Sequence, residues 1–385
     1  MKITDKYVYN YLSKSNSIEN GKCKLCGSFN LKDNECLDCG NKGSTLYYVE
    51  RPIKYHKHTV YYEFSLSKEQ KDASLFFLNH LINHKNAYLN AVCGSGKTEI
   101  MYESILYALN NRMKVLIAIP RKEIVKELYD RLKKVFRDTK IKYLDGTHHD
   151  DNAELIISTV NQLIHYEDEF DLVILDEADA YPFASNEYLH RLLHKSIKKD
   201  GVLFLMSATK KERIPYDKFT IKKRYHKHNL SMPNLIKIDC ENMAKNSVFI
   251  KILNNERKHI IYVPTIAYAK TLSKELNIDY ITSKNTNQEK LIKMLKSGYL
   301  KNIISTTILE RGITVRDVDV IVLESDDRVF THQTLIQICG RVGRSYEDPY
   351  GNIYFFYRRN SLKFYIVTKY IEKMNSWDVQ FVIKK

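Results

Sequence analysis

The sequence lacks any long hydrophobic run. No stretch of the 385-residue chain approaches the roughly 18 consecutive apolar residues that a membrane-spanning helix requires. Residues 1–20 are polar and charged, which is not typical of a secretory signal peptide. We therefore expect a cytoplasmic protein without a transmembrane segment.

Acidic residues are too few to balance the basic ones. Lysine and arginine total 61 against 46 aspartates and glutamates, which gives a net charge of +15 and a pI near 9.2. Such an excess favours an acidic partner, most often nucleic acid, although a lysine-rich surface without any partner would have the same composition. The 44% apolar and 28% charged fractions are those of an ordinary soluble globular chain. At roughly 150 residues per domain, the length allows two or three domains.

Cysteine is scarce, with seven residues in the chain. Three are scattered singly, as buried reduced thiols usually are: Cys93, Cys240 and Cys339. The other four form two C-x2-C pairs within "CKLCGSFNLKDNECLDCG" at residues 23–40, namely Cys23, Cys26, Cys36 and Cys39.

The two C-x2-C pairs predict a structural zinc site. A glycine follows each pair directly (Gly27 and Gly40) and allows the backbone to curl around an ion. The segment between the pairs has little apolar content, so a metal would supply the folding energy that a core cannot. Four thiolates fill a tetrahedral zinc ion and leave no open position for catalysis. A disulfide pair and a redox C-x2-C are the alternatives, and a cytosolic setting disfavours the disulfide.

From about residue 65 the chain predicts alternating strands and helices. Short apolar runs typical of buried parallel strands occur at 114–120, 153–160, 171–178 and 201–209, and again at 259–265, 278–283, 302–308, 318–325 and 351–357. The basic stretch at 222–235 lacks clear periodicity and predicts a linker between the two series. The expected architecture is α/β, with two units built on parallel sheets.

Three histidine pairs raise the question of a second metal site. They are His56 and His58, His148 and His149, and His226 and His228. None has cysteine or carboxylate neighbours at a suggestive spacing in the sequence. We therefore expect solvated basic loops at these positions.

The segment "AVCGSGKT" at 91–98 predicts a phosphate-binding loop, because it follows an apolar strand and opens a helix. Backbone N–H groups of Gly94, Ser95 and Gly96 would surround phosphate oxygens. Lys97 would reach the β- and γ-phosphates, and Thr98 would hold Mg2+. Ala91 stands where the general pattern has its first glycine.

The segment "LVILDEADA" at 172–180 ends a predicted strand with two acids. Asp176 suits a ligand of Mg2+-bound water, and Glu177 suits the base that orients an attacking water. A surface acidic turn is the alternative, and the phosphate loop upstream makes it the weaker one.

Weaker motifs follow in order along the chain. They are "SLSKEQ" (65–70), "IPRKE" (119–123), "STV" (158–160), "SAT" (207–209), "STTILERGITV" (305–315) and "QICGRVGR" (337–344). "IPRKE" and "STV" would grip nucleic-acid phosphates or merely cap helices. Arg341 and Arg344 would stabilise charge on the γ-phosphate, as arginine fingers do.

In this order the motifs resemble those of superfamily 2 DNA/RNA helicases with two RecA-like domains, over residues 65–357. Residues 176–179 have the sequence DEAD, which is a motif of that superfamily, and an alanine at the position of Ala91 is common there. The zinc module ahead of a compact motor is similar to the late competence ComFA family, and the PriA restart helicases are relatives. RNA helicases of the DEAD-box type usually have other residues at Gln337 and Ile338 and lack this module.

The resemblance implies further roles for individual residues. Gln70 would hydrogen-bond adenine, and nucleic acid would contact Pro120, Arg121, Ser158, Thr159, Thr306 and Thr307. Residues coupling ATP state to strand movement would be Asp179, Ser207, Thr209 and Gln337. The implied domains are an N-terminal region at 1–60 with the zinc module at about 21–42, an ATP-binding RecA-like domain at 61–225, and a helicase C-terminal domain at 226–385.

The implied function is ATP-dependent translocation of single-stranded DNA during natural transformation, with ATP, Mg2+ and structural Zn2+ as cofactors. Implied partners are single-stranded DNA, a membrane uptake channel, a phosphoribosyltransferase-like companion and a strand-loading protein. The resemblance also implies a place on the inner face of the cell membrane, and it leaves oligomerisation open. A PriA-like restart or repair helicase and a zinc-containing nucleic-acid-binding protein with a vestigial ATPase are the alternatives.

Overall fold

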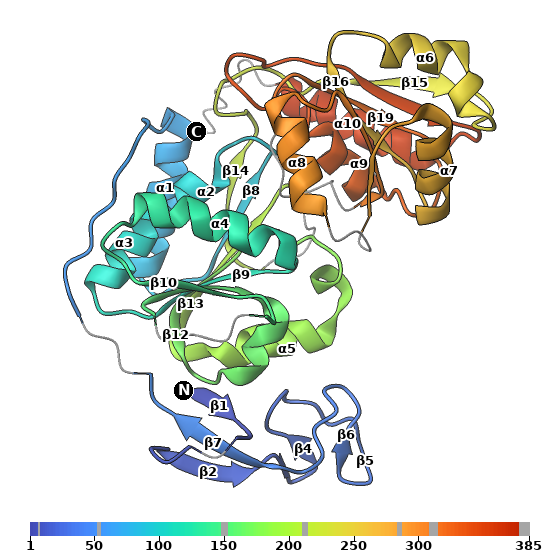
Figure 1. Cartoon of the computed structure of the whole chain (residues 1–385). Helices are drawn as coiled ribbons and strands as arrows, with labels where there is room; N and C mark the ends of the chain where they lie inside the picture. Colours follow the sequence, from blue (N-terminus) through green and yellow to red (C-terminus); the bar gives the residue numbers. More distant parts are fainter. Residues whose placement is uncertain are drawn as a thin grey trace. The chain divides into compact units, whose positions relative to one another are not determined.

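The computed structural model describes residues 1–6, 8–51, 55–147, 153–209, 215–282, 287–307 and 315–376, apart from the side chains of Glu123 and Glu289. The chain divides into two compact units (Figure 1). One comprises Met1–Ala91 and Lys97–Ile221, and the other comprises Val92–Gly96 and Lys222–Lys385.

The first unit is built on a seven-stranded, wholly parallel sheet with strand order β10-β11-β9-β12-β13-β8-β14. Its strands are β8 (Ala87–Ala91), β9 (Val115–Ile119), β10 (Ile141–Leu144), β11 (Leu155–Thr159), β12 (Phe170–Leu175), β13 (Ile197–Ser207) and β14 (Asp217–Ile221). Every residue of β8, β9 and β11 is buried, as expected of strands covered on both faces.

Different elements cover the two faces of this sheet. One face packs against α1 (Lys68–Ile82), α2 (Lys97–Ile100), α3 (Tyr102–Asn110) and α4 (Lys122–Val135). The other packs against η1 (Val160–His165), η2 (Phe183–Ser185) and α5 (Glu187–Ser196). Successive residues of a strand point to opposite faces of the sheet and so pack in different hydrophobic cores. Ile117, for example, packs in the core on the first face and Leu116 in the core on the second. On the first face Phe77 stacks on Phe204 with ring centroids 4.3 Å apart.

The second unit has a six-stranded parallel sheet with strand order β15-β20-β19-β16-β18-β17. Its strands are β15 (Pro233–Lys237), β16 (Lys258–Tyr262), β17 (Tyr280–Ile281), β18 (Asn302–Ser305), β19 (Val318–Val322) and β20 (Ile353–Tyr357). One face carries α8 (Gln288–Ser297), α9 (His332–Cys339) and α10 (Leu362–Asn375). The other carries η3 (Met243–Lys245), α6 (Ser247–Leu253) and α7 (Ile266–Leu276).

The fold class predicted from the sequence is confirmed. All nine apolar runs named above contain strands, and both sheets are parallel. Within the two parallel sheets, three strands escaped prediction: β10, β14 and β15. Each lies at a sheet edge, where one flank is unpaired and polar residues are tolerated, so the apolar run is short or interrupted. Pro233, in the stretch expected to be a linker, begins β15, a position that suits a residue without an N–H.

The N-terminal region folds as a small antiparallel module. A three-stranded sheet joins β1 (Lys2–Thr4), β7 (Thr45–Val49) and β2 (Ser13–Asn16) in the order β1-β7-β2. Two hairpins, β3 (Ile18–Glu19) with β4 (Lys22–Cys23) and β5 (Leu31–Lys32) with β6 (Glu35–Cys36), bring the cysteine pairs together.

This module packs on the second face of the first sheet. Cys23, Cys26 and Cys36 belong to the same hydrophobic core as residues of η1 and α5. The Lys195 ammonium donates hydrogen bonds to the carbonyl oxygens of Leu25 (2.6 Å) and Ile164 (3.1 Å). Arg191 forms an ion pair with Asp38 of the second hairpin. The module is therefore an integral layer of the first unit.

The buried carboxylate of Glu169 holds Arg51, which follows the last strand of the module, against the first unit. Glu169 accepts from Arg51 Nε at 2.7 Å and lies 3.1 Å from Lys114 Nζ. Burial raises the pKa of Glu169, but the nearby cations, Arg51 foremost, outweigh it and lower the pKa below its usual value. The carboxylate is thus paired and charged, which removes most of the cost of burying it.

Replacing Lys195 with methionine should loosen the packing of the module. The carbonyl oxygens of Leu25 and Ile164 would lose their donor, so we expect a loss of about 1–3 kcal/mol in the free energy of unfolding. Burial lowers the pKa of Lys195 from 10.5 to about 8, so the folded state binds fewer protons than the unfolded state between these pH values. The wild type should therefore gain stability relative to the variant from about pH 8 to 10.

Urea unfolding at several pH values measures both effects. Lys199→Met is the matched control, because Lys199 is exposed. Equal stability of the two variants at every pH would contradict the assigned contacts.

Candidate ATP site and four-cysteine centre

The predicted phosphate loop lies between β8 and α2. Gly94 and Gly96 have φ of +81° and +76°, in the left-handed region where glycine is favoured. The Ser95 N–H donates to the carbonyl of Val92 at 3.1 Å, which closes the turn. Lys97 begins α2, so the loop leads directly into a helix, as the motif requires.

Lys97 and Asp176 interact electrostatically. Asp176 follows β12 and is half-buried. Desolvation raises its pKa from 3.8 to about 6, although the Lys97 ammonium lowers it and the Glu177 carboxylate adds to the rise. The Lys97 ammonium donates to the carbonyl of Ala91 at 3.1 Å. A cation bound beside Asp176 would favour its charged form, as expected of a group that helps to hold hydrated Mg2+.

The acidic turn has an unusual backbone. Glu177 has φ of +56°, which is uncommon for a residue with a side chain. Asp176 Oδ1 accepts from the Glu177 N–H at 2.8 Å, and Ala178 N–H donates to Met206 at 2.9 Å. These bonds hold the turn against β13 and fix the backbone of Glu177, the residue predicted to be the base.

Thr98, the predicted Mg2+ ligand, has a partner that the sequence did not reveal. Its hydroxyl accepts a hydrogen bond from Arg131 of α4 at 3.0 Å, and Arg131 also lies 3.7 Å from Glu99. A threonine hydroxyl oxygen has two lone pairs, so it can accept from Arg131 with one and bind Mg2+ with the other.

The last residue of "DEAD" contacts the "SAT" segment. The Thr209 hydroxyl donates to Asp179 Oδ2 at 2.5 Å. Ser207 Oγ accepts from the Thr209 N–H at 3.1 Å and donates to the Thr209 carbonyl at 2.7 Å. Three of the four residues predicted to couple ATP state to strand movement are therefore one hydrogen-bonded group.

Gln70 has a structural role beside the predicted one. It forms a capping box with Ser67 at the start of α1: Ser67 N–H donates to Gln70 Oε1 at 2.8 Å, and Gln70 N–H donates to Ser67 Oγ at 3.3 Å. This pair orients the glutamine amide, and adenine recognition by Gln70 stays a prediction.

The predicted nucleic-acid contacts of the first unit share one sheet edge. Pro120 and Arg121 follow β9, and Ser158 and Thr159 end β11, its parallel neighbour. Ser158 is fully buried, and its hydroxyl donates a hydrogen bond to the Thr159 carbonyl at 2.9 Å. In this structure the hydroxyl therefore bonds to the backbone at the end of β11.

The remaining predicted residues lie in the second unit. Thr306 and Thr307 follow β18, half-buried, while residues 308–314 of their motif lie outside the described part of the chain. Gln337 is buried in α9, and Arg341 is buried just after it. Arg344 Nε donates to the Gly340 carbonyl at 2.7 Å. Their proposed roles stay predictions.

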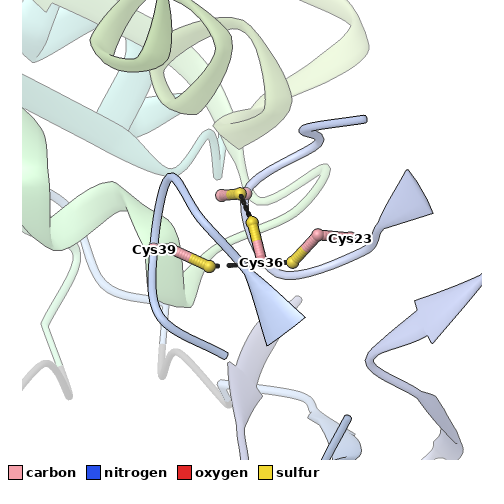
Figure 2. A group of neighbouring side chains, drawn as sticks. Cys23, Cys36 and Cys39 are labelled. Atoms are coloured by element: carbon pink, nitrogen blue, oxygen red, sulfur yellow. Dashed lines mark hydrogen bonds between the residues drawn. The ribbon is translucent and has the colours of Figure 1, made fainter. Parts of the chain in front are cut away.

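The four cysteines form a compact thiol cluster (Figure 2). Cys26 Sγ lies 3.5 Å from Cys36 Sγ, and Cys23 Sγ lies 3.7 Å from Cys39 Sγ. Sulfurs bound to a tetrahedral zinc ion at 2.3 Å are about 3.8 Å apart, so the cluster needs little adjustment to hold zinc. Burial raises the pKa of Cys26, and raises that of Cys39 to about 12, which means that metal binding must release protons.

The histidine prediction is wrong for two residues. His58 and His226 are 3% and 6% exposed and are not solvated. His58 Nδ1 lies 2.9 Å from Thr139 Oγ1, and His226 Nε2 lies 3.0 Å from the Gly343 carbonyl. These partners are remote in sequence, so no local pattern could have revealed them. Residues 148 and 149 lie outside the described residues.

Comparison with known proteins shows which family the chain belongs to. The chain is 30% identical to "Competence protein ComFA" of Streptococcus pneumoniae strain R6, over 93% of this chain and 91% of that protein. It is also 30% identical to the protein of the same name from Bacillus subtilis strain 168, over 80% of this chain and 72% of that one. The chain belongs to the ComFA family.

More distant matches agree with this assignment. The family "Type III restriction enzyme, res subunit" matches residues 63–212, and "Helicase conserved C-terminal domain" matches 244–346. "Replication restart protein PriA" of Rickettsia prowazekii is 26% identical over 57% of this chain and 39% of its own length.

Solved structures support the fold. Yeast Dbp5, bound to RNA and ADP BeF3, aligns with a TM-score of 0.59 at 16% identity, over 81% of this chain and 92% of that one. Mycobacterium smegmatis Lhr, bound to single-stranded DNA and AMP-PNP, gives 0.57 at 16% identity, over 81% and 50%.

This ComFA-family protein is an ATP-hydrolysing helicase or translocase with a role in competence. Its domains imply ATP as a cofactor, and a helicase binds nucleic acid. Among the helices of the described residues, none is long and apolar enough to cross a bilayer.

Lys97→Ala should abolish turnover. The variant loses the ammonium predicted to contact the β- and γ-phosphates, so we expect the rate of ATP hydrolysis to fall by at least about 10²–10³-fold. Because Lys97 lowers the pKa of Asp176, its removal should also raise that pKa further and weaken Mg2+-ATP binding near pH 6. Steady-state hydrolysis from pH 5.5 to 8 measures both effects, with Lys218→Ala on β14 as control. Unchanged turnover would reject the assigned phosphate site.

Loss of the predicted zinc ion should destabilise the first unit. The cysteines share a core with η1 and α5, so Cys36→Ser or treatment with a strong chelator should lower the unfolding free energy by several kcal/mol. Elemental analysis and thermal unfolding check this, with Cys240→Ala as the control that keeps the four thiols. Full stability of the Cys36→Ser protein without bound zinc would contradict a structural role.

Proposed function

We propose that the protein is a single-stranded DNA translocase that uses ATP to drive DNA uptake during natural transformation. The observation that carries this proposal is the similarity to two competence proteins along most of their length. It is supported by the placement of Lys97 near Asp176 and by the hydrogen bond between Asp179 and Thr209.

In the proposed cycle, Lys97 holds the triphosphate, and Thr98 and Asp176 would hold hydrated Mg2+. Glu177 orients the attacking water, and Arg341 and Arg344 stabilise the charge that develops on the γ-phosphate. Mg2+ supplies charge neutralisation when bound. Asp179, Thr209 and Ser207 transmit the loss of the γ-phosphate to the strand edge that grips nucleic acid.

The grip on the strand is proposed to act through its phosphates. Pro120, Arg121, Ser158 and Thr159 in the first unit and Thr306 and Thr307 in the second would contact the backbone, so sequence preference should be weak and salt sensitivity strong. The three implied domains (1–60, 61–225 and 226–385) remain part of this proposal, as do the membrane channel and the phosphoribosyltransferase-like companion as partners.

The zinc module has two proposed roles. Its shared core with η1 and α5 and its Lys195 contacts favour stabilisation of the first unit. Its outer side carries exposed Phe29, which the ammonium of Lys22 approaches to 5.6 Å, and exposed Leu37. These side chains would suit an accessory contact to DNA or to the uptake machinery.

Two structural neighbours bind different nucleic acids, RNA in one case and single-stranded DNA in the other. We expect single-stranded DNA to stimulate ATP hydrolysis of this protein at least about tenfold more than duplex DNA or RNA does. Steady-state hydrolysis with each polymer at one fixed salt concentration measures this, since backbone binding depends strongly on salt.

Stimulation mainly by RNA would reject the DNA-uptake proposal and place the protein among RNA helicases. Strong stimulation by forked duplexes, with strand separation, would favour the PriA-like restart helicase. Absence of turnover with every polymer would favour the nucleic-acid-binding protein with a vestigial ATPase.

A further inference from the structure

A second cluster of potential metal ligands lies in the first unit, apart from the four cysteines. His56 and His58 precede α1, and Glu154 directly precedes β11. One ligand atom from each of these side chains lies within 4.8 Å of the others. The fold has thus brought to the histidine pair the carboxylate that is missing from its sequence neighbourhood.

The histidines are oriented by hydrogen bonds through one ring nitrogen each. His56 Nε2 lies 2.5 Å from the Asp138 carbonyl, which can only accept, so this nitrogen carries a proton and Nδ1 has the lone pair of the neutral ring. His58 Nδ1 lies 2.9 Å from Thr139 Oγ1, which leaves Nε2 for a ligand. Metal-binding histidines are held in this way by a partner on the other nitrogen.

Glu154 is oriented in the same manner. Its Oε2 accepts a hydrogen bond from the Lys140 N–H at 2.9 Å, while Oε1 lies 3.3 Å from His56 Nδ1. A lone pair on His56 therefore faces a carboxylate oxygen, and this arrangement needs a cation between the two atoms. The cation is either a proton on His56 or a metal ion.

The separation fits a metal ion. Two ligands bound to tetrahedral zinc at 2.0–2.1 Å are about 3.3 Å apart, as His56 Nδ1 and Glu154 Oε1 are. His58, the third candidate ligand, is buried beside these two atoms.

We propose that His56, His58 and Glu154 bind a divalent first-row transition metal ion, with zinc the best match and water in the fourth position. Two imidazoles and one carboxylate form a ligand set that zinc accepts readily. This site is distinct from the four-cysteine centre and contains no sulfur ligand.

The position of the site indicates what the ion does. Asp138, Thr139 and Lys140 precede β10, and Glu154 precedes β11, so the site lies at the amino ends of these strands. The proposed phosphate and Mg2+ ligands of the ATP site lie at the carboxyl ends of their strands. The ion therefore fastens the segment around residues 56–61, which leads from the N-terminal module to α1, onto the sheet edge. Hydrogen bonds of that segment with Asn110, Val135 and Asp138 reinforce the attachment.

The test compares zinc binding by the full-length wild type and Glu154→Gln, both with the four-cysteine centre already loaded. Glutamine keeps the shape and an acceptor for Lys140 but loses the charged ligand. Calorimetric titration with Zn2+ should detect one site in the wild type and a dissociation constant raised at least about 100-fold in the variant. Thr139→Val should raise it about tenfold by freeing the His58 ring.

The chain contains its own control, because the tetrapeptide "YHKH" occurs at 55–58 and again at 225–228. Among the residues that the structure describes, the second copy belongs to no metal-ligand cluster, so His228→Gln should bind Zn2+ as the wild type does. Co2+ at the proposed site should give visible bands without thiolate charge transfer.

Equal Zn2+ binding by the wild type and Glu154→Gln would overturn the proposal and leave a protonated His56 paired with Glu154. Loss of binding in His228→Gln to the same degree would overturn it as well. Should Glu154→Gln fail to fold, His56→Ala replaces it in the same Zn2+ titration, because His56 is the more exposed ligand. The dissociation constant should rise in that variant as well.

Discussion

Both faces of a parallel sheet must be covered, and this constraint organises the first unit. Helices α1 to α4 cover one face. On the other, α5 and η1 share one hydrophobic core with three cysteines of the N-terminal module. The module thus completes the layer that hides the sheet from water, because a parallel sheet exposed on one side would leave apolar strand residues in contact with solvent. The four-cysteine cluster and the helices η1 and α5 are therefore packed into one core.

The same sheet separates two kinds of chemistry. The phosphate loop, the acidic turn and the "SAT" segment follow the carboxyl ends of β8, β12 and β13, where parallel strands deliver consecutive loops to one edge. The proposed His56, His58 and Glu154 site lies at the amino ends of β10 and β11. Binding of an ion there would stabilise the scaffold without entering the ATP site, as stabilising contacts usually do at the edge opposite the chemistry.

Two carboxylates of the first unit differ in how the surrounding residues stabilise their charge. Glu169 keeps a lowered pKa because Arg51 and other cations surround it, whereas desolvation prevails at Asp176 and raises its pKa to about 6. Glu169 stabilises the fold in its charged form, whereas Asp176 is the carboxylate that we propose to bind hydrated Mg2+. Their different surroundings distinguish a structural carboxylate from one arranged for binding.

Local pattern was enough to predict the two parallel-sheet units, the phosphate loop, the acidic turn and the paired cysteines. Apolar runs, glycine turns and C-x2-C spacing are properties of neighbouring residues, so the chain displays them directly. It did not display β10, β14 and β15, which as edge strands have no full apolar run. Nor did it display the contacts of Arg131 with Thr98, of Lys195 with Leu25, or of Glu154 with His56. Those contacts join residues far apart in the chain, and only the tertiary packing of strands and helices brings them within bonding distance.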